Sequence, residues 1–126
     1  MNIIDSSGWL EYFADGPNAS FFSRPLQKTT ELIVPTVTVY EVFKTVLRQR
    51  NESDALQSVA LMQQGSVVDL TSNIAILAAK LSIDHHLPMA DSIILATARA
   101  YGATIWTQGS DFKNIDGIQY IEKKNG

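Results

Sequence analysis

The chain of 126 residues contains no cysteine. This absence excludes disulfide bonds, a catalytic thiolate and a cysteine-ligated zinc site. Long apolar runs are also missing, since none approaches the ~20 residues that a membrane-spanning helix requires. The first residues, Met1 to Asp5, lack the basic segment and apolar run of a signal peptide. The sequence therefore predicts a cytoplasmic protein without a membrane segment.

An excess of positive charge is missing as well. Lys and Arg number 10 against 13 Asp and Glu, which gives a formal net charge of −3. Proteins that hold nucleic acid by broad neutralisation of its phosphates are usually basic, so this balance counts against such a surface. The objection weakens if several acids converge on divalent cations, because bound cations reverse the sign of the local field.

The rest of the composition is typical of a soluble globular protein, with 45% hydrophobic and 18% charged residues. The length fits a single domain, 1–126, with a core of its own. Short apolar segments, predicted as strands, alternate with stretches of helical periodicity; the strands are expected at 1–5, 32–34, 67–70, 104–106 and 118–121. This alternation predicts an α/β fold with a mostly parallel five-stranded sheet and right-handed crossovers.

The segment 87–98, LPMADSIILATA, predicts a buried helix with one carboxylate near its start. Pro88 has a backbone suited to a first helical turn. Asp91 shares a face with apolar residues three, four and seven positions further on, so its carboxylate needs a partner. Two interpretations stay open: a helix-start acid that uses free N–H groups, which is the commoner role for a lone Asp, or a metal ligand at the rim of a site.

Three further acids lie near predicted strand ends or helix starts. Asp5 follows the first strand and precedes Ser6, where it fits either an N-cap or a site. Glu41 lies on the helix that begins at Val37, about 160° from its apolar stripe. The commoner interpretation of Glu41 is a solvated side chain paired with Lys44. Asp111 lies in the polar loop 107–112, just past the fourth strand.

His85 and His86 close the helix before Leu87. Adjacent side chains on a helix diverge by about 100°, so the two rings cannot easily share one ion. Cationic residues also suit a helix C-terminus, and we therefore predict a structural role for both.

The carboxyl ends of parallel strands meet at one edge of a sheet, so residues far apart in sequence can form one site there. Carboxylates without cysteine or a convincing histidine fit Mg²⁺, which prefers oxygen ligands. One or two such ions can activate water and stabilise charge on a phosphodiester. The predicted site contains four acids and two hydroxyl residues that could orient water or a phosphate oxygen: Asp5, Glu41, Asp91, Asp111, Thr107 and Ser6.

These segments resemble the PIN domain, and more narrowly the VapC-type toxins of bacterial toxin–antitoxin pairs. The resemblance lies in Asp5-Ser6 after the first strand, Glu41 in TVYEV, Asp91 in MADSIILATA, and the loop Thr107 to Phe112. The Asp91 segment and the Thr-x-x-x-Asp-Phe loop are its most specific parts. It covers essentially the whole chain, in the same order.

The resemblance implies a three-layer α/β/α fold and a Mg²⁺- or Mn²⁺-dependent endoribonuclease that cleaves RNA. It assigns Asp5, Glu41 and Asp91 as the main metal-binding acids and Asp111 as the fourth, with Thr107 and Ser6 as polar helpers. It also implies a homodimer and a cognate VapB-like antitoxin that covers or enters the acidic groove.

One position departs from the family pattern. Many members have Asp two residues after the loop threonine, where this chain has Gly109. We therefore expect a second ion to bind weakly or only together with substrate. Gly109 also leaves open a catalytically weak PIN domain that binds RNA or a protein partner without cleavage.

A signalling receiver domain is a further alternative of similar size. It requires an acidic pair after the first strand, where this chain has only Asp5, and a phosphoacceptor Asp after the third, where Asp69 is followed by Leu70 and a helix cap. We regard it as the weaker alternative.

Several residues are candidates for contact with RNA. The candidates for phosphate contacts, each more commonly a solvated surface charge, are Lys44, Arg48, Arg50 and Lys113. The candidates for stacking on bases, each more commonly a core aromatic, are Tyr40, Tyr101 and Trp106.

Overall fold

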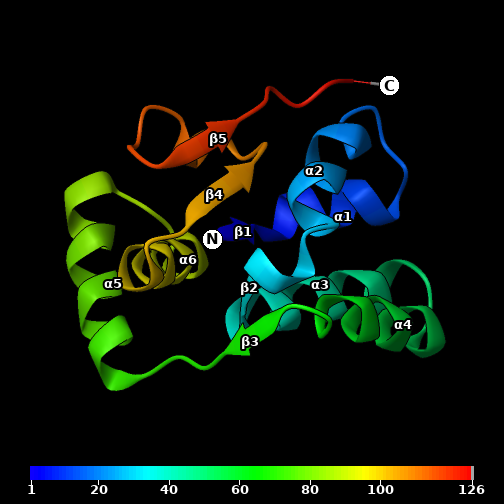
Figure 1. The fold of residues 1–126 in the computed structure, drawn as a ribbon, viewed down its shortest axis with the longest axis horizontal. Helices are drawn as coiled ribbons and strands as arrows, with labels where there is room; N and C mark the ends of the chain where they lie inside the picture. The colour runs from blue at the N-terminus through cyan, green and yellow to red at the C-terminus, as the bar shows by residue number, and fades with distance from the viewer. Residues whose placement is uncertain (126) are drawn as a thin grey trace.

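The structure, a computed structural model, describes residues 1–125 (Figure 1). Its elements follow the order β1 (Asn2–Ile4), α1 (Ser6–Phe13), α2 (Ala19–Leu26), the 3₁₀ turn η1 (Thr29–Glu31), β2 (Ile33–Pro35), α3 (Thr36–Gln49), α4 (Glu52–Met62), β3 (Ser66–Val68), α5 (Ser72–His85), α6 (Met89–Tyr101), β4 (Thr104–Thr107), the 3₁₀ turn η2 (Ser110–Phe112) and β5 (Ile118–Tyr120). The five predicted strands are all present, and helices occupy the segments between them as expected.

Every strand ladder is parallel, which confirms the predicted α/β fold. The ladders form a three-stranded sheet, β1-β4-β5, and a two-stranded sheet, β2-β3. A single parallel bridge between Asn2 and Leu32 links them. The expected continuous five-stranded sheet is therefore wrong in this detail. Both strands at the break have only three residues, and β2 ends at Pro35, which has no N–H to donate.

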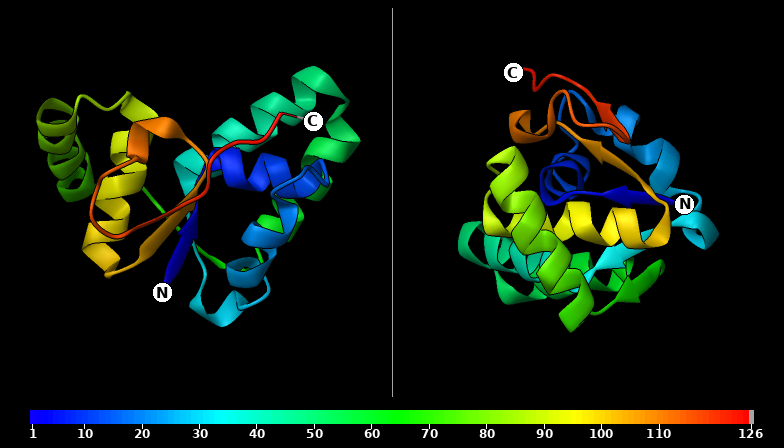
Figure 2. Two further views of the ribbon diagram at one scale, coloured as in Figure 1. Left: turned by 90° about the horizontal axis from the view of Figure 1, so that it is seen from above. Right: turned by 90° about the vertical axis from the view of Figure 1, so that its left-hand side faces the viewer.

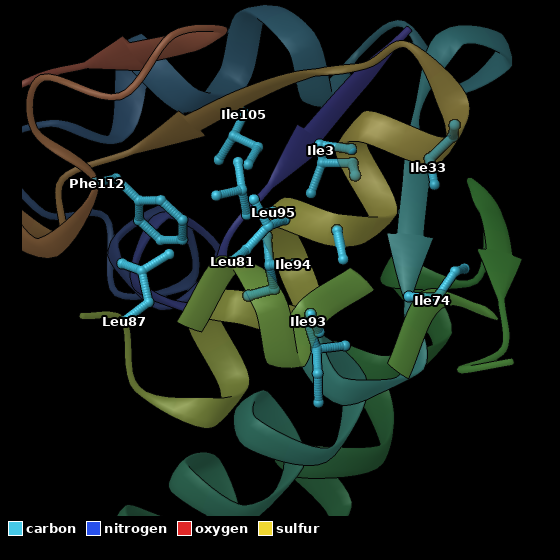
Figure 3. Packing of buried hydrophobic residues seen from close by; sticks show 13 residues of the cluster. Ile3, Ile33, Ile74, Leu81, Leu87, Ile93, Ile94, Leu95, Ile105 and Phe112 are labelled. Atoms are coloured by element: carbon cyan, nitrogen blue, oxygen red, sulfur yellow. The ribbon is translucent and has the colours of Figure 1, made fainter. Parts of the chain in front are cut away.

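Two hydrophobic clusters lie on opposite faces of the strands, because successive side chains of a strand point to opposite sides. Ile3 and Ile33 pack against α5 and α6, together with Ile94 and Phe112 (Figure 3). Their sequence neighbours pack the other way, against α1 to α4, in a cluster that includes Ile4, Val34, Trp9, Phe22, Val42 and Met62. Figure 2 shows α5 and α6 on one side of the strands and α1 to α4 on the other, the expected three-layer arrangement.

Local signals in the sequence explain several helix ends. Thr71 caps α5 by accepting a hydrogen bond from the Ile74 N–H at 3.2 Å. Gly102 ends α6 in the left-handed region with φ of 62°. His85 ends α5 and the exposed His86 is its left-handed C-cap, so both lie at the predicted helix end. Pro88 differs slightly from expectation, since it is the N-cap of α6 with ψ of 158° and not part of the first turn.

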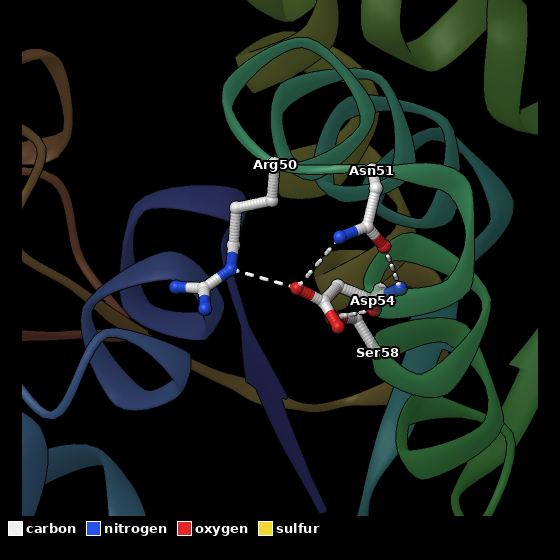
Figure 4. Close-up of polar contacts among 4 residues, drawn as sticks. All are labelled: Arg50, Asn51, Asp54 and Ser58. Carbon is white, nitrogen blue, oxygen red and sulfur yellow. Dashed lines mark hydrogen bonds and ion pairs between the residues drawn. The ribbon is translucent and has the colours of Figure 1, made fainter.

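The turn between α3 and α4 is held by polar contacts (Figure 4). Asn51 caps α4 by accepting from the Asp54 N–H at 2.8 Å, and Arg50 Nε donates to the Asp54 carboxylate at 2.8 Å. The ion pair is largely exposed, so it contributes little to stability. This turn and the end of α1 line a cleft of about 480 Å³, whose walls include Leu10, Phe13, Arg50 and Leu61. None of the predicted site residues lines it.

Within residues 1–125, no helix is both long enough and apolar enough to cross a bilayer.

Candidate functional site

Asp5 lies where β1 ends and α1 begins, and only 4% of its surface is exposed. Its Oδ1 accepts hydrogen bonds from Ser7 Oγ at 2.7 Å and from the Gly8 N–H at 2.9 Å. Its Oδ2 accepts from Thr107 Oγ1 at 2.6 Å. Burial raises the pKa of Asp5 above its ordinary value, and these hydrogen bonds oppose the rise. Asp5 is thus an N-cap that three donors also hold in one orientation.

Thr107 links the end of β1 to the loop after β4. It is the last residue of β4 and is fully buried. Its hydroxyl donates to Asp5 and accepts from the Gly109 N–H at 2.8 Å, which fixes the start of the loop after β4. The predicted role of Thr107 as a polar helper therefore has a definite geometry: it orients Asp5.

Gly8 is a site residue that the sequence analysis did not single out. A Cβ built on Gly8 would lie 2.6 Å from Ile4 Cγ2 and 2.6 Å from the Phe22 ring. Only glycine therefore allows α1 to pack here while its N–H donates to Asp5. The available signal was a glycine in the first turn of a helix, where it costs stability unless packing requires it.

Glu41 lies in the second turn of α3 and is half-buried. Ser6 Oγ, at the start of α1, donates to Glu41 Oε1 at 2.5 Å. Lys44 does not pair with Glu41; its Nζ donates to Tyr40 Oη at 3.4 Å. The expected solvated Glu41–Lys44 pair is therefore wrong, because this part of α3 faces the start of α1.

Asp91 lies in the first turn of α6 and is half-buried. Burial, followed by repulsion from Asp5, Glu41 and Asp111, raises its pKa to about 7. Among residues 1–125, no backbone N–H donates to Asp91, so it does not cap its helix. Asp111 lies in η2 and is exposed. The charges of the other three predicted acids thus act on the carboxylate of Asp91.

The donor set of this cluster is suited to a hard cation by its chemistry. The four acids offer oxygen atoms only, which Mg²⁺ and Mn²⁺ prefer, and their mutual repulsion is what a cation would relieve. Within residues 1–125, however, no three acidic or histidine side chains form a group compact enough to hold an ion as they stand. Side chains such as that of the exposed Asp111 would have to close in around it.

Gly109 lies directly beside the oriented carboxylate. Its backbone is extended, with φ of −79°, so a residue with a side chain could adopt the same conformation. A Cβ there would lie 3.3 Å from Thr107 Oγ1 and 3.6 Å from Asp5 Oδ2. A side chain at position 109 would therefore face the acids.

A buried amide network adjoins the site at Gln108, and it was also missed from the sequence. Asn18 is 1% exposed, and its Nδ2 donates to Gln108 Oε1 at 2.9 Å and to the Glu122 carbonyl at 3.0 Å. Its own N–H donates to Glu11 Oε2 at 2.8 Å. The network joins the α1–α2 turn, the loop after β4 and the segment after β5. No local pattern marks such a role, because the partners lie 90 and 104 residues from Asn18.

Of the three aromatic residues named as candidates for base stacking, one has the commoner role of a core aromatic. Trp106 packs against Phe21 with ring centroids 5.1 Å apart, and its indole N–H donates to Asn2 Oδ1, so it is a core residue. Tyr40 and Tyr101 are 62% and 46% exposed and are not core residues.

A family model described as "PIN domain" matches residues 3–118, most of the chain. The chain belongs to the PIN domain family. The predicted family resemblance and fold are therefore confirmed. A comparison with curated proteins found no match.

Solved structures with the same fold include toxins and toxin–antitoxin complexes. The PIN domain aligns with a toxin–antitoxin complex from Klebsiella pneumoniae with a TM-score of 0.79 and 20% identity, over 94% of this chain and 96% of that one. It aligns with VapC20 of Mycobacterium tuberculosis, described as a sarcin–ricin loop cleaving toxin, with a TM-score of 0.77 and 14% identity, over 93% and 96%. It aligns with DNA-bound VapBC from Salmonella typhimurium with a TM-score of 0.74 and 16% identity, over 97% of this chain and 98% of that one. At such identities these similarities establish the fold.

Proposed function

We propose that this PIN domain is a metal-dependent endoribonuclease and the toxin of a VapBC-type toxin–antitoxin pair. The observation that carries the proposal is the group of four carboxylates in one field around a rigidly held Asp5. Repulsion from the other three contributes to the raised pKa of Asp91. Such a field favours a divalent cation, and a cation at the end of parallel strands is suited to hydrolysis of a phosphodiester.

In this proposal Asp5, Glu41 and Asp91 are the main ligands of Mg²⁺ or Mn²⁺, and Asp111 is the fourth. When bound, the metal supplies a Lewis acid for the phosphate and lowers the pKa of a water molecule. Asp5 needs no reorientation, because Ser7, Gly8 and Thr107 already hold both of its oxygens.

The hydroxyl residues have distinct tasks in the same scheme. Thr107 orients Asp5, and Ser6 orients Glu41 through its hydrogen bond to Oε1. Such partners behind a metal ligand fix its orientation, and their loss typically reduces metal affinity or activity 10–100-fold. A second ion is expected to bind weakly or only with substrate, since Gly109 adds no carboxylate beside Asp5.

The proposed partners are an RNA substrate, a VapB-like antitoxin and a second copy of the chain. Support for an antitoxin comes from the structural neighbours, several of which are described as VapBC or toxin–antitoxin complexes. The homodimer stays a prediction from the family resemblance. Cytoplasmic localisation likewise stays a prediction.

A PIN domain that binds RNA or a protein without cleavage is the second candidate. Gly109 favours it, because a site without a carboxylate at position 109 offers fewer ligands to a second ion than a site with Asp there. The two candidates differ in one respect that can be measured directly, which is metal-dependent cleavage.

The experiment is a Mn²⁺ titration of purified protein, free of antitoxin, with total RNA and mapping of the fragment ends. We expect discrete cuts that increase with Mn²⁺, and a loss of at least about 100-fold in Asp91→Asn, because a direct ligand is removed. Asp84→Asn is the matched control, since Asp84 is an exposed acid of α5, and it should cut like the wild type. Metal binding by folded wild-type protein without any cuts would support the non-cleaving alternative.

A further inference from the structure

A polar pocket of about 430 Å³ opens beside the acid cluster. Two of its lining residues are tied to the site: Ser7 donates to Asp5 Oδ1, and the Gly109 N–H donates to Thr107. The lining consists of hydroxyl, amide, charged and aromatic groups from three segments: Ser7, Gln108, Gly109, Ser110, Tyr120, Glu122 and Lys123. The proposed function uses none of the last three.

Strand register places an aromatic ring one strand away from Thr107. Tyr120 pairs with Thr107 in the β4–β5 ladder, so their side chains leave the sheet on the same face. Asp5 follows β1 at the same level, because its N–H donates to the Trp106 carbonyl and its carboxylate meets Thr107. Asp5, Thr107 and Tyr120 therefore form a row across the carboxyl ends of β1, β4 and β5.

Positive charge accompanies this ring. Lys123 lines the pocket, and Lys113 Nζ lies 5.9 Å from the centroid of the Tyr120 ring, within the range of a cation–π contact. Within the part of the chain that the structure describes, neither lysine forms an ion pair with an acid. Two lysines thus remain available for an anion at the edge of a cluster of four acids.

The backbone that carries Lys123 is held in place. The Ile121 N–H donates to the Thr107 carbonyl at 3.0 Å, which continues the ladder past β5. Asn18 Nδ2 donates to the Glu122 carbonyl at 3.0 Å. Figure 1 shows this segment running from β5 toward α1 and α2. Lys123 follows directly and is therefore kept at the pocket wall.

We propose that this pocket binds the nucleotide next to the scissile phosphate of a single-stranded RNA. Its base stacks on Tyr120 and its phosphate pairs with Lys123. An accessible aromatic ring beside an unpaired lysine is the combination with which proteins hold single-stranded nucleic acid. The inference rests on the proposed nuclease function, and it adds two residues that determine substrate affinity and not the chemical step.

The first test measures KM and kcat of Mn²⁺-dependent cleavage as a function of salt. We expect Tyr120→Leu to raise KM about tenfold and Tyr120→Phe to retain the wild-type value, because stacking requires an aromatic face but no hydroxyl. Lys123→Ala should raise KM roughly three- to tenfold and reduce the salt slope of substrate binding by about one. In all three variants kcat should stay within about twofold of the wild-type value, since they remove binding and not chemistry.

Lys124→Ala is the matched control, because Lys124 is the exposed neighbour of Lys123 and does not line the pocket. It should leave KM and the salt slope unchanged. Equal effects of Lys123→Ala and Lys124→Ala, or an unchanged KM in Tyr120→Leu protein with a native circular dichroism spectrum, would overturn the proposal.

A second measurement separates this proposal from the nuclease proposal. Fluorescence anisotropy reports binding of a labelled oligouridylate to Asp91→Asn protein, whether or not the wild type cleaves RNA. Weaker binding after adding Tyr120→Leu or Lys123→Ala supports the pocket even if the wild type cuts nothing. Unchanged RNA binding together with weaker binding of a cognate antitoxin would assign the pocket to a protein partner and reject the RNA assignment.

Discussion

At the scale of single residues, Gly8 decides whether Asp5 can be held as it is. Its N–H is one of three donors to the Asp5 carboxylate, and its missing side chain leaves room for the Phe22 ring. The hydrogen bond and the close packing require the same position of the backbone. The carboxylate and the hydrophobic cluster on this face of the sheet are therefore coupled through one glycine.

Gly8→Ala should destabilise the protein by about 1–3 kcal/mol, the usual cost of overpacking a core. A Cβ at 2.6 Å from Ile4 and Phe22 forces one of them to move. The gain in helix propensity from glycine to alanine, at most ~1 kcal/mol, opposes this but is smaller than the expected clash. Urea denaturation with the midpoint and slope compared to wild type measures the difference.

A double-mutant cycle tests the cause of that loss. In a Phe22→Leu background the ring is absent, so Gly8→Ala should cost less than it does in the wild type. Equal costs in the two backgrounds would mean that the Phe22 contact does not explain the effect.

At the scale of elements, Asn18 connects three segments: the α1–α2 turn, the loop after β4 and the segment after β5. Its side-chain amide holds Gln108 after β4 and Glu122 after β5. Gln108 directly follows Thr107, so the same amide stabilises the loop that begins beside Asp5.

Asn18→Ala should lower the free energy of unfolding by about 1–3 kcal/mol, because it leaves the buried Gln108 amide and the Glu122 carbonyl without their donor. Hydrogen exchange at residues 121–124 should increase more than in the helices. Asn73→Ala is the control, since Asn73 is exposed on α5 and its loss should change stability by no more than about 0.5 kcal/mol. Unchanged exchange at residues 121–124 would show that Asn18 does not hold this segment.

The sequence predicts well those features that depend on residues close together in the chain. The Thr71 cap and the Gly102 stop are of this kind, because each acts within a few residues of its own position. The commoner interpretation of Glu41, a solvated pair with Lys44, is wrong, because its partner Ser6 lies 35 residues away on another helix. The break between β1 and β2 was missed for a similar reason, since strand patterns do not show where two ladders separate.

The grouping of the acids was predicted from a rule of topology, because parallel strands bring their carboxyl ends together. That rule applies to Asp5, Asp91 and Asp111 without knowledge of any contact. Gly8 and Asn18 were missed, since their roles depend on side-chain packing between segments and leave no periodic signal. The ligand roles of the acids stay a prediction until metal binding is measured.

At the scale of the whole molecule, the acid cluster makes stability depend on pH. The pKa of Asp91 is about 7 in the folded protein and near 3.8 in an unfolded chain, so the folded state binds its proton more tightly. Stability therefore falls as pH rises through the window between these values. Burial shifts the pKa of Asp5 in the same direction.

We expect metal-free protein to melt at a higher temperature at pH 5.5 than at pH 7.5. Asp91 should contribute about 1–2 kcal/mol to the difference after allowance for solvent screening, because its side chain is only partly buried. Differential scanning fluorimetry over this range measures it. In Asp91→Asn the dependence should be weaker, and the same slope in both proteins would contradict the assignment to Asp91.

Addition of Mn²⁺ at pH 7.5 should raise the melting temperature of the wild type, since a ligand that binds only the folded state stabilises it. The same addition should have little effect on Asp91→Asn. Identical shifts in both proteins would show that the ion binds elsewhere.

The distance in sequence between Asp5 and Thr107 also has a consequence for a protein that is still being synthesised. The two residues are separated by 102 positions, and β1 can pair with β4 only after β4 exists. At a translation rate of about 5–20 residues per second, Asp5 waits on the order of 5–20 seconds before the codon for Thr107 is read. The acid cluster of a nascent chain is therefore incomplete until synthesis has passed Thr107 and Asp111.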